Sequence, residues 1–156
     1  MNKHFKSVCF FSLIFFIIDQ AVKLYLKGEL VFNQSIVLVK NFFNITLVKN
    51  TGAAFSILEN NTTLLIVIGI LAFLAIIFYV YKLVEMDDFD VFSYSLLLGG
   101  VLGNLVDRIV HGYVIDYISL NIFGYHIPIF NFADICIVIS VILIIWTTLK
   151  GEVWKR

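Results

Sequence analysis

Charged residues are scarce in this sequence, and their scarcity limits the kinds of protein that it can encode. Lys, Arg, Asp and Glu make up 14% of the 156 residues, hydrophobic residues make up 61%, and the mean hydropathy is +0.99. A soluble domain is about one quarter charged, and so short a chain cannot hide such an excess of apolar side chains. The 11 basic and 11 acidic residues cancel, which argues against a nucleic-acid-binding protein. A lipid bilayer is the solvent that this composition suits.

Cysteine and histidine are also few, which argues against several kinds of centre. Cys9 and Cys136 both lie in apolar runs, so we expect packing residues rather than a disulfide. His4, His111 and His126 are scattered, and the zinc-protease sequence H-E-x-x-H does not occur. A glycine-rich phosphate loop does not occur either. The sequence therefore predicts no metal site and no cofactor.

Four apolar segments are long enough to cross a membrane, which needs about 20 residues each. The first has a basic start like that of a signal peptide, but no convincing small-residue cleavage site follows it, so we predict a retained helix. We predict a single, mainly α-helical membrane domain over residues 1–156, with helices at approximately 5–26, 63–82, 91–110 and 133–149.

The longer connections are predicted to be extramembrane. Within residues 27–62, Ser35–Val39 and Asn44–Val48 are rich in β-branched residues and bounded by asparagines, which predicts a short strand pair in a small sheet against the bilayer. Gly52–Phe55 is predicted to be a tight turn. Residues 111–132 are predicted to be a loop, and the acidic stretch around residues 85–90 a solvated turn.

An even number of spans places both termini on the same side of the membrane. Basic residues are enriched at both ends of the chain, which predicts that the termini are cytoplasmic, although the charge bias is weak. In this topology the polar residues of the spans and of the outer connections gather near the outer leaflet. They are Asp19, Asn50, Asn104, Asp107, Arg108, Asp116, Asn131 and Asp134.

Asp116 and Asp134 are the strongest candidates for chemistry. Each has apolar neighbours and no basic residue within four positions, and together they flank one short segment. Helix capping or solvation would explain either residue alone, and Asp134 also suits the first turn of a helix. As a pair beside other polar residues, they indicate a site. Two close carboxylates share one proton, so one can activate water while the other protonates a carbonyl oxygen, as in aspartic proteases.

Other polar and small residues have plausible structural roles. Asp107 could form a local ion pair with Arg108 or cap its helix, and we favour a helix pair at i, i+4 for Asp19 and Lys23. Gly99 and Gly103 form a small-xxx-small face that suits close helix packing.

Five short motifs make the chain resemble the lipoprotein signal peptidases (signal peptidase II), and together they extend over nearly the whole sequence. They occur in family order at residues 19–23 (D-Q-x-x-K), 50–55 (N-x-G-x-A-F), 103–108 (G-N-x-x-D-R), 112–117 (G-x-V-x-D-[FY]) and 130–134 (F-N-x-A-D).

The resemblance implies an activity, a substrate and an inhibitor. It implies a membrane aspartic endopeptidase that cleaves a prolipoprotein just before a diacylglyceryl-modified cysteine, and that is inhibited by the cyclic peptide globomycin. The catalytic aspartates would be Asp116 and Asp134. The residues implied to line the substrate pocket are Asn50, Gly52, Asn104, Arg108 and Asn131. We expect a monomer in the bacterial cytoplasmic membrane.

Two other functions fit parts of the pattern. Intramembrane carboxylates also serve proton-coupled transporters, and the Gly99/Gly103 face could be the contact of a non-catalytic assembly subunit. Within the peptidase interpretation, an edge strand at Asn44–Val48 could pair with extended substrate backbone.

Overall fold

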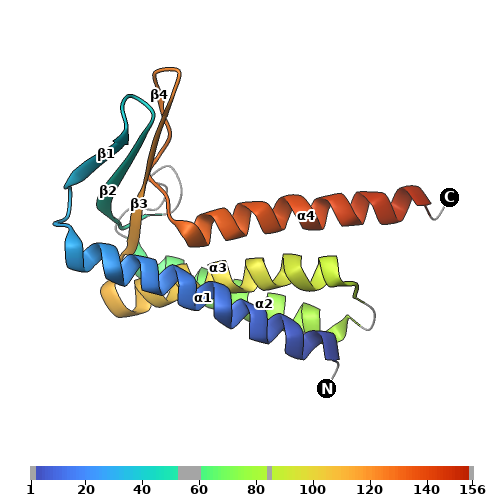
Figure 1. Cartoon of the computed structure of the whole chain (residues 1–156). Helices are drawn as coiled ribbons and strands as arrows, with labels where there is room; N and C mark the ends of the chain where they lie inside the picture. The colour runs from blue at the N-terminus through green and yellow to red at the C-terminus, as the bar shows by residue number, and fades with distance from the viewer. Residues whose placement is uncertain (1–2, 53–60, 84–85, 155–156) are drawn as a thin grey trace.

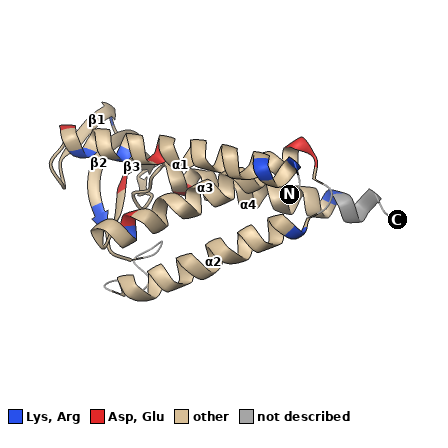
Figure 2. Cartoon of the chain, turned by 90° about the horizontal axis from the view of Figure 1, so that it is seen from below, with Lys and Arg blue, Asp and Glu red and all other residues tan. Residues whose placement is uncertain are grey.

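Four long helices form the body of the molecule. The computed structural model describes residues 3–52, 61–83 and 86–154. All four helices are long and apolar enough to cross a membrane. They lie alongside one another, with a small sheet at one end (Figure 1), and their central parts carry few charged residues (Figure 2). Their bounds are α1 (Lys3–Glu29), α2 (Thr62–Lys82), α3 (Asp88–His111) and α4 (Phe132–Trp154). The predicted four-helix membrane fold is confirmed.

Helix α3 begins earlier than the sequence analysis predicted. The Asp87 side chain accepts a hydrogen bond from the Asp90 N–H at 2.8 Å, and Asp88 and Asp90 lie in the first turn. Acidic side chains favour a helix N-terminus because they complement its dipole. The prediction of a solvated turn was therefore wrong for Asp88 and Asp90. At the other end, Gly112 terminates α3 in a left-handed conformation at φ +79°.

Helix α3 packs between α1 and α4, and its glycines allow the close approach. A Cβ atom added at Gly99 would lie 2.8 Å from the Ser12 carbonyl oxygen of α1. One at Gly100 would lie 2.6 Å from the Ala133 oxygen of α4. The small-residue packing face is confirmed, and its partner is a helix of the same chain. The alternative in which Gly99 contacts another subunit is therefore wrong.

The sheet has four antiparallel strands in sequence order. They are β1 (Ser35–Val39), β2 (Phe43–Asn50), β3 (Val114–Ile122) and β4 (Tyr125–His126). The predicted pair is confirmed as β1 and β2. The prediction of a loop over residues 111–132 was wrong in part, because β3 and β4 lie there. For the predicted turn at 52–55, residues 53–55 lie outside the described residues.

Strand β2 is an inner strand of this sheet. It pairs with β1 on one side and with β3 on the other, from Phe43↔Leu120 to Asn50↔Val114. Its backbone groups are therefore already used, and the hypothesis that Asn44–Val48 is a free edge for substrate was wrong. Beneath the sheet, Leu47, Ile115 and Tyr117 pack around Leu30, just beyond the end of α1. This cluster fixes the start of β3 against the helices.

Candidate active site

The polar residues that the sequence singled out meet where the sheet joins the helices. Asp116 lies near the start of β3, and Asp134 lies in the first turn of α4. Asn104 comes from α3, and Asn50 ends β2. Pairing of Val48 with Asp116 and of Asn50 with Val114 brings the end of β2 beside Asp116. Segments far apart in sequence thus form one site.

Asp116 is 1% exposed and accepts two side-chain hydrogen bonds. Asn131 Nδ2 donates to its Oδ1 at 2.6 Å, and Asn50 Nδ2 donates to its Oδ2 at 2.8 Å. Burial, and after it the charge of Asp134, raises the pKa of Asp116 to about 6, although both amide donors lower it. A carboxyl group with such a pKa can exchange a proton near neutral pH.

Asp134 is held by reciprocal bonds at the start of α4. Its backbone N–H donates to Asn131 Oδ1 at 3.0 Å, and its Oδ2 accepts the Asn131 N–H at 3.1 Å. This is a capping box built from Asn and Asp. Asn104 Nδ2 donates to Asp134 Oδ1 at 2.7 Å. All four carboxylate oxygens of Asp116 and Asp134 therefore accept an N–H donor, and Asn131 bonds to both residues.

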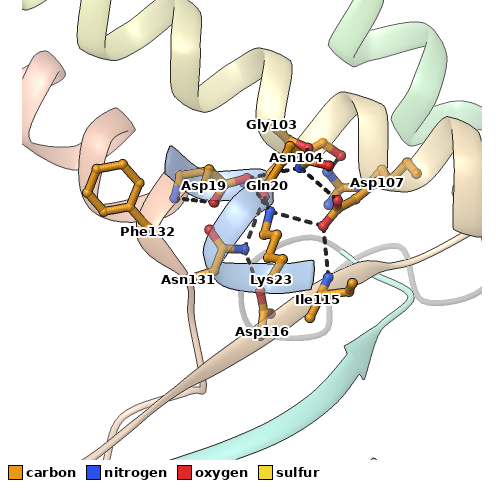
Figure 3. A network of polar contacts seen from close by, with 12 residues as sticks. Asp19, Gln20, Lys23, Gly103, Asn104, Asp107, Ile115, Asp116, Asn131 and Phe132 are labelled. Carbon is orange, nitrogen blue, oxygen red and sulfur yellow. Dashed lines mark hydrogen bonds and ion pairs between the residues drawn. The ribbon is translucent and has the colours of Figure 1, made fainter. Parts of the chain in front are cut away.

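A buried ammonium group lies in the polar network that also includes Asn104, Asn131 and Asp116 (Figure 3). Lys23 of α1 is 2% exposed. Its Nζ lies 2.7 Å from Asp19 Oδ2 and 2.9 Å from Asp107 Oδ2, and it donates to Asn104 Oδ1 at 3.2 Å. Because Lys can only donate, it fixes the Asn104 amide with the oxygen toward Lys23 and the Nδ2 toward Asp134.

The two carboxylates that bind Lys23 also bind backbone next to the candidate pair. Asp19 Oδ1 accepts the Ala133 N–H at 3.0 Å, and Asp107 Oδ2 accepts the Ile115 N–H at 3.0 Å. Each donor residue directly precedes Asp134 or Asp116. The predicted Asp19–Lys23 pair is present, whereas the local Asp107–Arg108 pair or cap was wrong, because the Asp107 carboxylate faces Lys23 instead.

Two residues of this region were given no role by the sequence analysis. Gln20 Nε2 lies 3.1 Å from Asp19 Oδ2 and 3.0 Å from Asp107 Oδ1, bridging the carboxylates (Figure 3). The Tyr117 hydroxyl accepts the Phe132 N–H at 3.2 Å and so ties β3 to the start of α4. Both residues lie inside the motifs quoted above, which was the signal available to find them.

Arg108 connects α3 to the segment that follows β2. Its Nη2 donates to the Gly52 carbonyl oxygen at 2.9 Å, and its Nη1 donates to the Asn104 carbonyl oxygen at 3.3 Å. The Gly52 N–H in turn donates to Asn50 Oδ1 at 3.0 Å, which orients the amide that binds Asp116. The Nε of Arg108 is buried, with no hydrogen-bond partner among the described residues.

A pocket of about 1060 Å³ opens beside the two carboxylates. Asp116 and Asp134 line it together with Lys49, Asn50, Thr51, Asn104 and Arg108, and the other lining residues are apolar. The apolar lining includes Val114, Ile127, Pro128, Ile129, Phe130, Ile135, Ile137, Val138 and Ile139. The site can therefore hold a ligand that has both polar and apolar parts.

The chain is similar to known proteins over nearly its whole length. A family model described as signal peptidase (SPase) II matches residues 11–150. Lipoprotein signal peptidases of Staphylococcus aureus strains Newman and N315 are each 38% identical over 99% of this chain and 96% of their own length. Two solved structures of a bacterial membrane enzyme, at 2.3 and 1.9 Å resolution, are each 36% identical. The first covers 97% of this chain and 92% of its own at a TM-score of 0.89, and the second covers 93% and 94% at 0.83.

Proposed function

Since the chain belongs to the signal peptidase II family, we propose that Asp116 and Asp134 are its catalytic pair. The chain is a multi-pass membrane protein and an aspartic peptidase that cleaves signal peptides from prolipoproteins, so neither the transporter nor the assembly-subunit alternative applies. The observation that carries the proposal is that the Asn131 side chain links the two aspartates, which line the same pocket. Its Nδ2 donates to the carboxylate of Asp116, and its Oδ1 accepts the backbone N–H of Asp134.

The reaction follows from one shared proton. The ionised carboxylate of the pair takes a proton from a water molecule while the water oxygen bonds to the scissile carbonyl carbon. The protonated partner donates its proton to the carbonyl oxygen. When the resulting tetrahedral species collapses, one of its hydroxyl groups returns a proton to the ionised carboxylate as the C–N bond breaks. The amine leaves with the proton that came from water, so the pair again holds one proton. The N–H donors on all four oxygens keep the two carboxyl groups oriented through these transfers.

The pocket supports a lipid-modified substrate. We infer that the peptide lies against the polar lining residues, where Asn50, Asn104 and Arg108 present donors, and that cleavage falls just before a diacylglyceryl-modified cysteine. The acyl chains would then lie against Ile135 and Val138 of α4, on the apolar wall of the pocket. A ligand with a peptide and two long acyl chains matches a pocket whose lining combines polar residues with many apolar ones. Globomycin would occupy the same pocket.

Asp19, Gln20, Lys23 and Asp107 are proposed to be positioning residues. They do not line the pocket, but their bonds reach the backbone on the N-terminal side of both catalytic residues. Gly52 has a related role, because it links Arg108 to Asn50. We further propose that the protein acts as a monomer in the cytoplasmic membrane, with both termini cytoplasmic and the site near the outer leaflet.

A cleavage assay on a diacylglyceryl-modified prolipoprotein tests the proposed pair. Asp116→Asn and Asp134→Asn should each abolish cutting while the protein stays folded, and globomycin should inhibit the wild type. Asp88→Asn, an exposed aspartate at the opposite end of α3, serves as the matched control and should cut normally. Normal cutting by either folded active-site variant would remove that residue from the mechanism. The same substrate without its lipid should be cut more slowly if the acyl chains bind the apolar wall.

A further inference from the structure

The turn between β3 and β4 has an unusual residue at its tip. Ile122 pairs with Tyr125, which leaves a two-residue loop of Phe123 at φ +53° and Gly124 at φ +85°. Two positive φ values define the type I′ hairpin turn, in which Asn-Gly is the favoured sequence. A bulky residue at positive φ is disfavoured. The needs of the turn therefore do not explain why Phe occupies position 123, and its side chain is fully exposed.

Other exposed apolar side chains surround Phe123. Ile122 and Tyr125 flank it, and the neighbouring β1–β2 connection contributes the half-exposed Phe42. The two connections lie side by side, because the Asn121 N–H donates to the Phe42 carbonyl oxygen at 2.9 Å. We call these four residues, Phe42, Ile122, Phe123 and Tyr125, the tip surface.

The chain around the tip surface lacks the charges that keep an exposed hairpin soluble. Residues 117–133 contain no Asp, Glu, Lys or Arg, and residues 30–48 contain one, Lys40. Exposed strand edges in soluble proteins normally carry charged side chains that prevent association. An uncharged apolar tip indicates that another apolar phase covers it.

The arrangement of the elements identifies that phase. The sheet lies at one end of the membrane-crossing helices, and its hairpins extend across the direction of the helix axes, away from the bundle (Figure 1). When the helices span a bilayer, the hairpins therefore run along its surface. Aromatic side chains favour the boundary between headgroups and acyl chains, and a nearby Lys can reach lipid phosphate.

We propose that the tip surface inserts into the membrane interface at the sheet end of the molecule, with Phe123 as its anchor and lipid as its partner. Strand β3 then has two fixed ends. Its start carries Asp116 beside the helices, and its far end rests in lipid about 20 Å away, at about 3.3 Å per residue. The anchor holds the sheet at a constant height above the bilayer without contacting the pocket described above.

Tryptophan fluorescence in lipid vesicles tests the proposal without reference to activity. The reporter is Phe123→Trp in a background with the two native tryptophans replaced by Phe, and the matched control is Val31→Trp. Val31 is 74% exposed and lies before β1, outside the tip surface. We expect blue-shifted emission from position 123, quenching by lipids brominated in the upper acyl chain, and protection from aqueous iodide. Position 31 should show the reverse. Iodide quenching at position 123 would overturn the proposal, and protection from both quenchers would mean that protein covers the tip.

A second variant separates the role of the Phe123 ring from that of the turn. Phe123→Asn creates the favoured Asn-Gly turn, so the melting temperature in detergent should not fall. A Tyr125→Trp reporter should be quenched by brominated lipid when Phe123 is present and should become open to iodide in the Phe123→Asn variant. If the reporter stays at the same depth in both proteins, Phe123 is not the anchor.

Discussion

Asn50 controls how readily Asp116 gives up a proton. Its Nδ2 donates to Asp116 Oδ2, and a donor to a carboxylate favours the charged form and lowers the pKa. In Asn50→Ala this donor is lost, so the pKa of Asp116 should rise further above its present value of about 6. A hydrogen bond to a charged group contributes about 1.5–3 kcal/mol, which corresponds to a shift of at least about one pH unit.

The pH profile of kcat/KM measures this shift. Activity requires one proton on the pair, so activity falls as pH rises through the pKa at which that proton leaves. The alkaline limb of Asn50→Ala should therefore move to higher pH. Thr46→Ala, which removes an exposed hydroxyl of β2 bonded to Ser35, should leave the limb in place. A limb that moves to lower pH in Asn50→Ala would contradict the assignment.

Substitution of Lys23 tests whether this residue positions Asp116 and Asp134 or only stabilises the fold. In Lys23→Met, Asp19 and Asp107 lose the buried cation between them, and breaking a buried ion pair typically costs 3–5 kcal/mol. The segments that carry Asp116 and Asp134 should shift, and a displacement of about 1 Å can lower kcat on the order of 100-fold. Lys23→Arg keeps the charge and should recover part of kcat. A variant with normal kcat and only a lower melting temperature would show a structural role alone.

The sequence was a good guide to the residues of the site and a poor guide to their contacts. The resemblance to the family implied all seven proposed catalytic and pocket residues, and six of them, all but Gly52, were also noted as polar residues near the outer leaflet. It could not show that Asp107 faces Lys23 rather than Arg108, since adjacent helix positions point about 100° apart and the partner lies 84 residues away. It also gave no sign that Asn131 bonds to both aspartates.

At the scale of elements, the close contact between α1 and α3 depends on Gly103 as well as on Gly99. A Cβ atom at Gly103 would lie 2.5 Å from Asp19 Oδ2. Gly103→Ala should therefore push Asp19 away from Lys23 and cost about 1–3 kcal/mol, as overpacking does. Gly28→Ala is the matched control, because a Cβ atom there meets nothing within 4 Å and Ala favours a helix by about 0.5–1 kcal/mol. Thermal unfolding in detergent should show opposite shifts for the two variants.

The helices were predictable because long apolar runs are a strong signal. Strands β3 and β4, which form half of the sheet, were not predicted. Val114, Ile115, Asp116 and Tyr117 are all buried, so the start of β3 lacks the alternation of apolar and polar residues that identifies a strand. Strand β4 has only two residues. The prediction of β1 and β2 succeeded because β-branched residues bounded by asparagines are a local signal.

For the whole molecule, cysteine labelling tests the proposed topology. Single cysteines at Lys150, in the last turns of α4, and at Val31, before β1, lie at opposite ends of the helices. In intact cells a membrane-impermeant maleimide should modify Val31→Cys and spare Lys150→Cys until the membrane is opened. Cys136 is buried, and both native cysteines lie inside membrane-crossing helices, so they should contribute little background. Labelling of Lys150→Cys alone in intact cells would invert the topology.

The network around Lys23 joins the first helix to the last one, so it is complete only after the whole chain has been made. Lys23 belongs to the first helix, while Ala133 and Asp134 open the last one. During synthesis, the chain up to residue 130 lacks one of the two proposed catalytic carboxyl groups and the backbone donor that Asp19 binds. If Asp134 is catalytic as proposed, a nascent chain with three helices inserted is inactive, and the last helix completes the site. In the folded protein, its own long apolar N-terminal segment, which resembles the start of a signal peptide, is packed against α3.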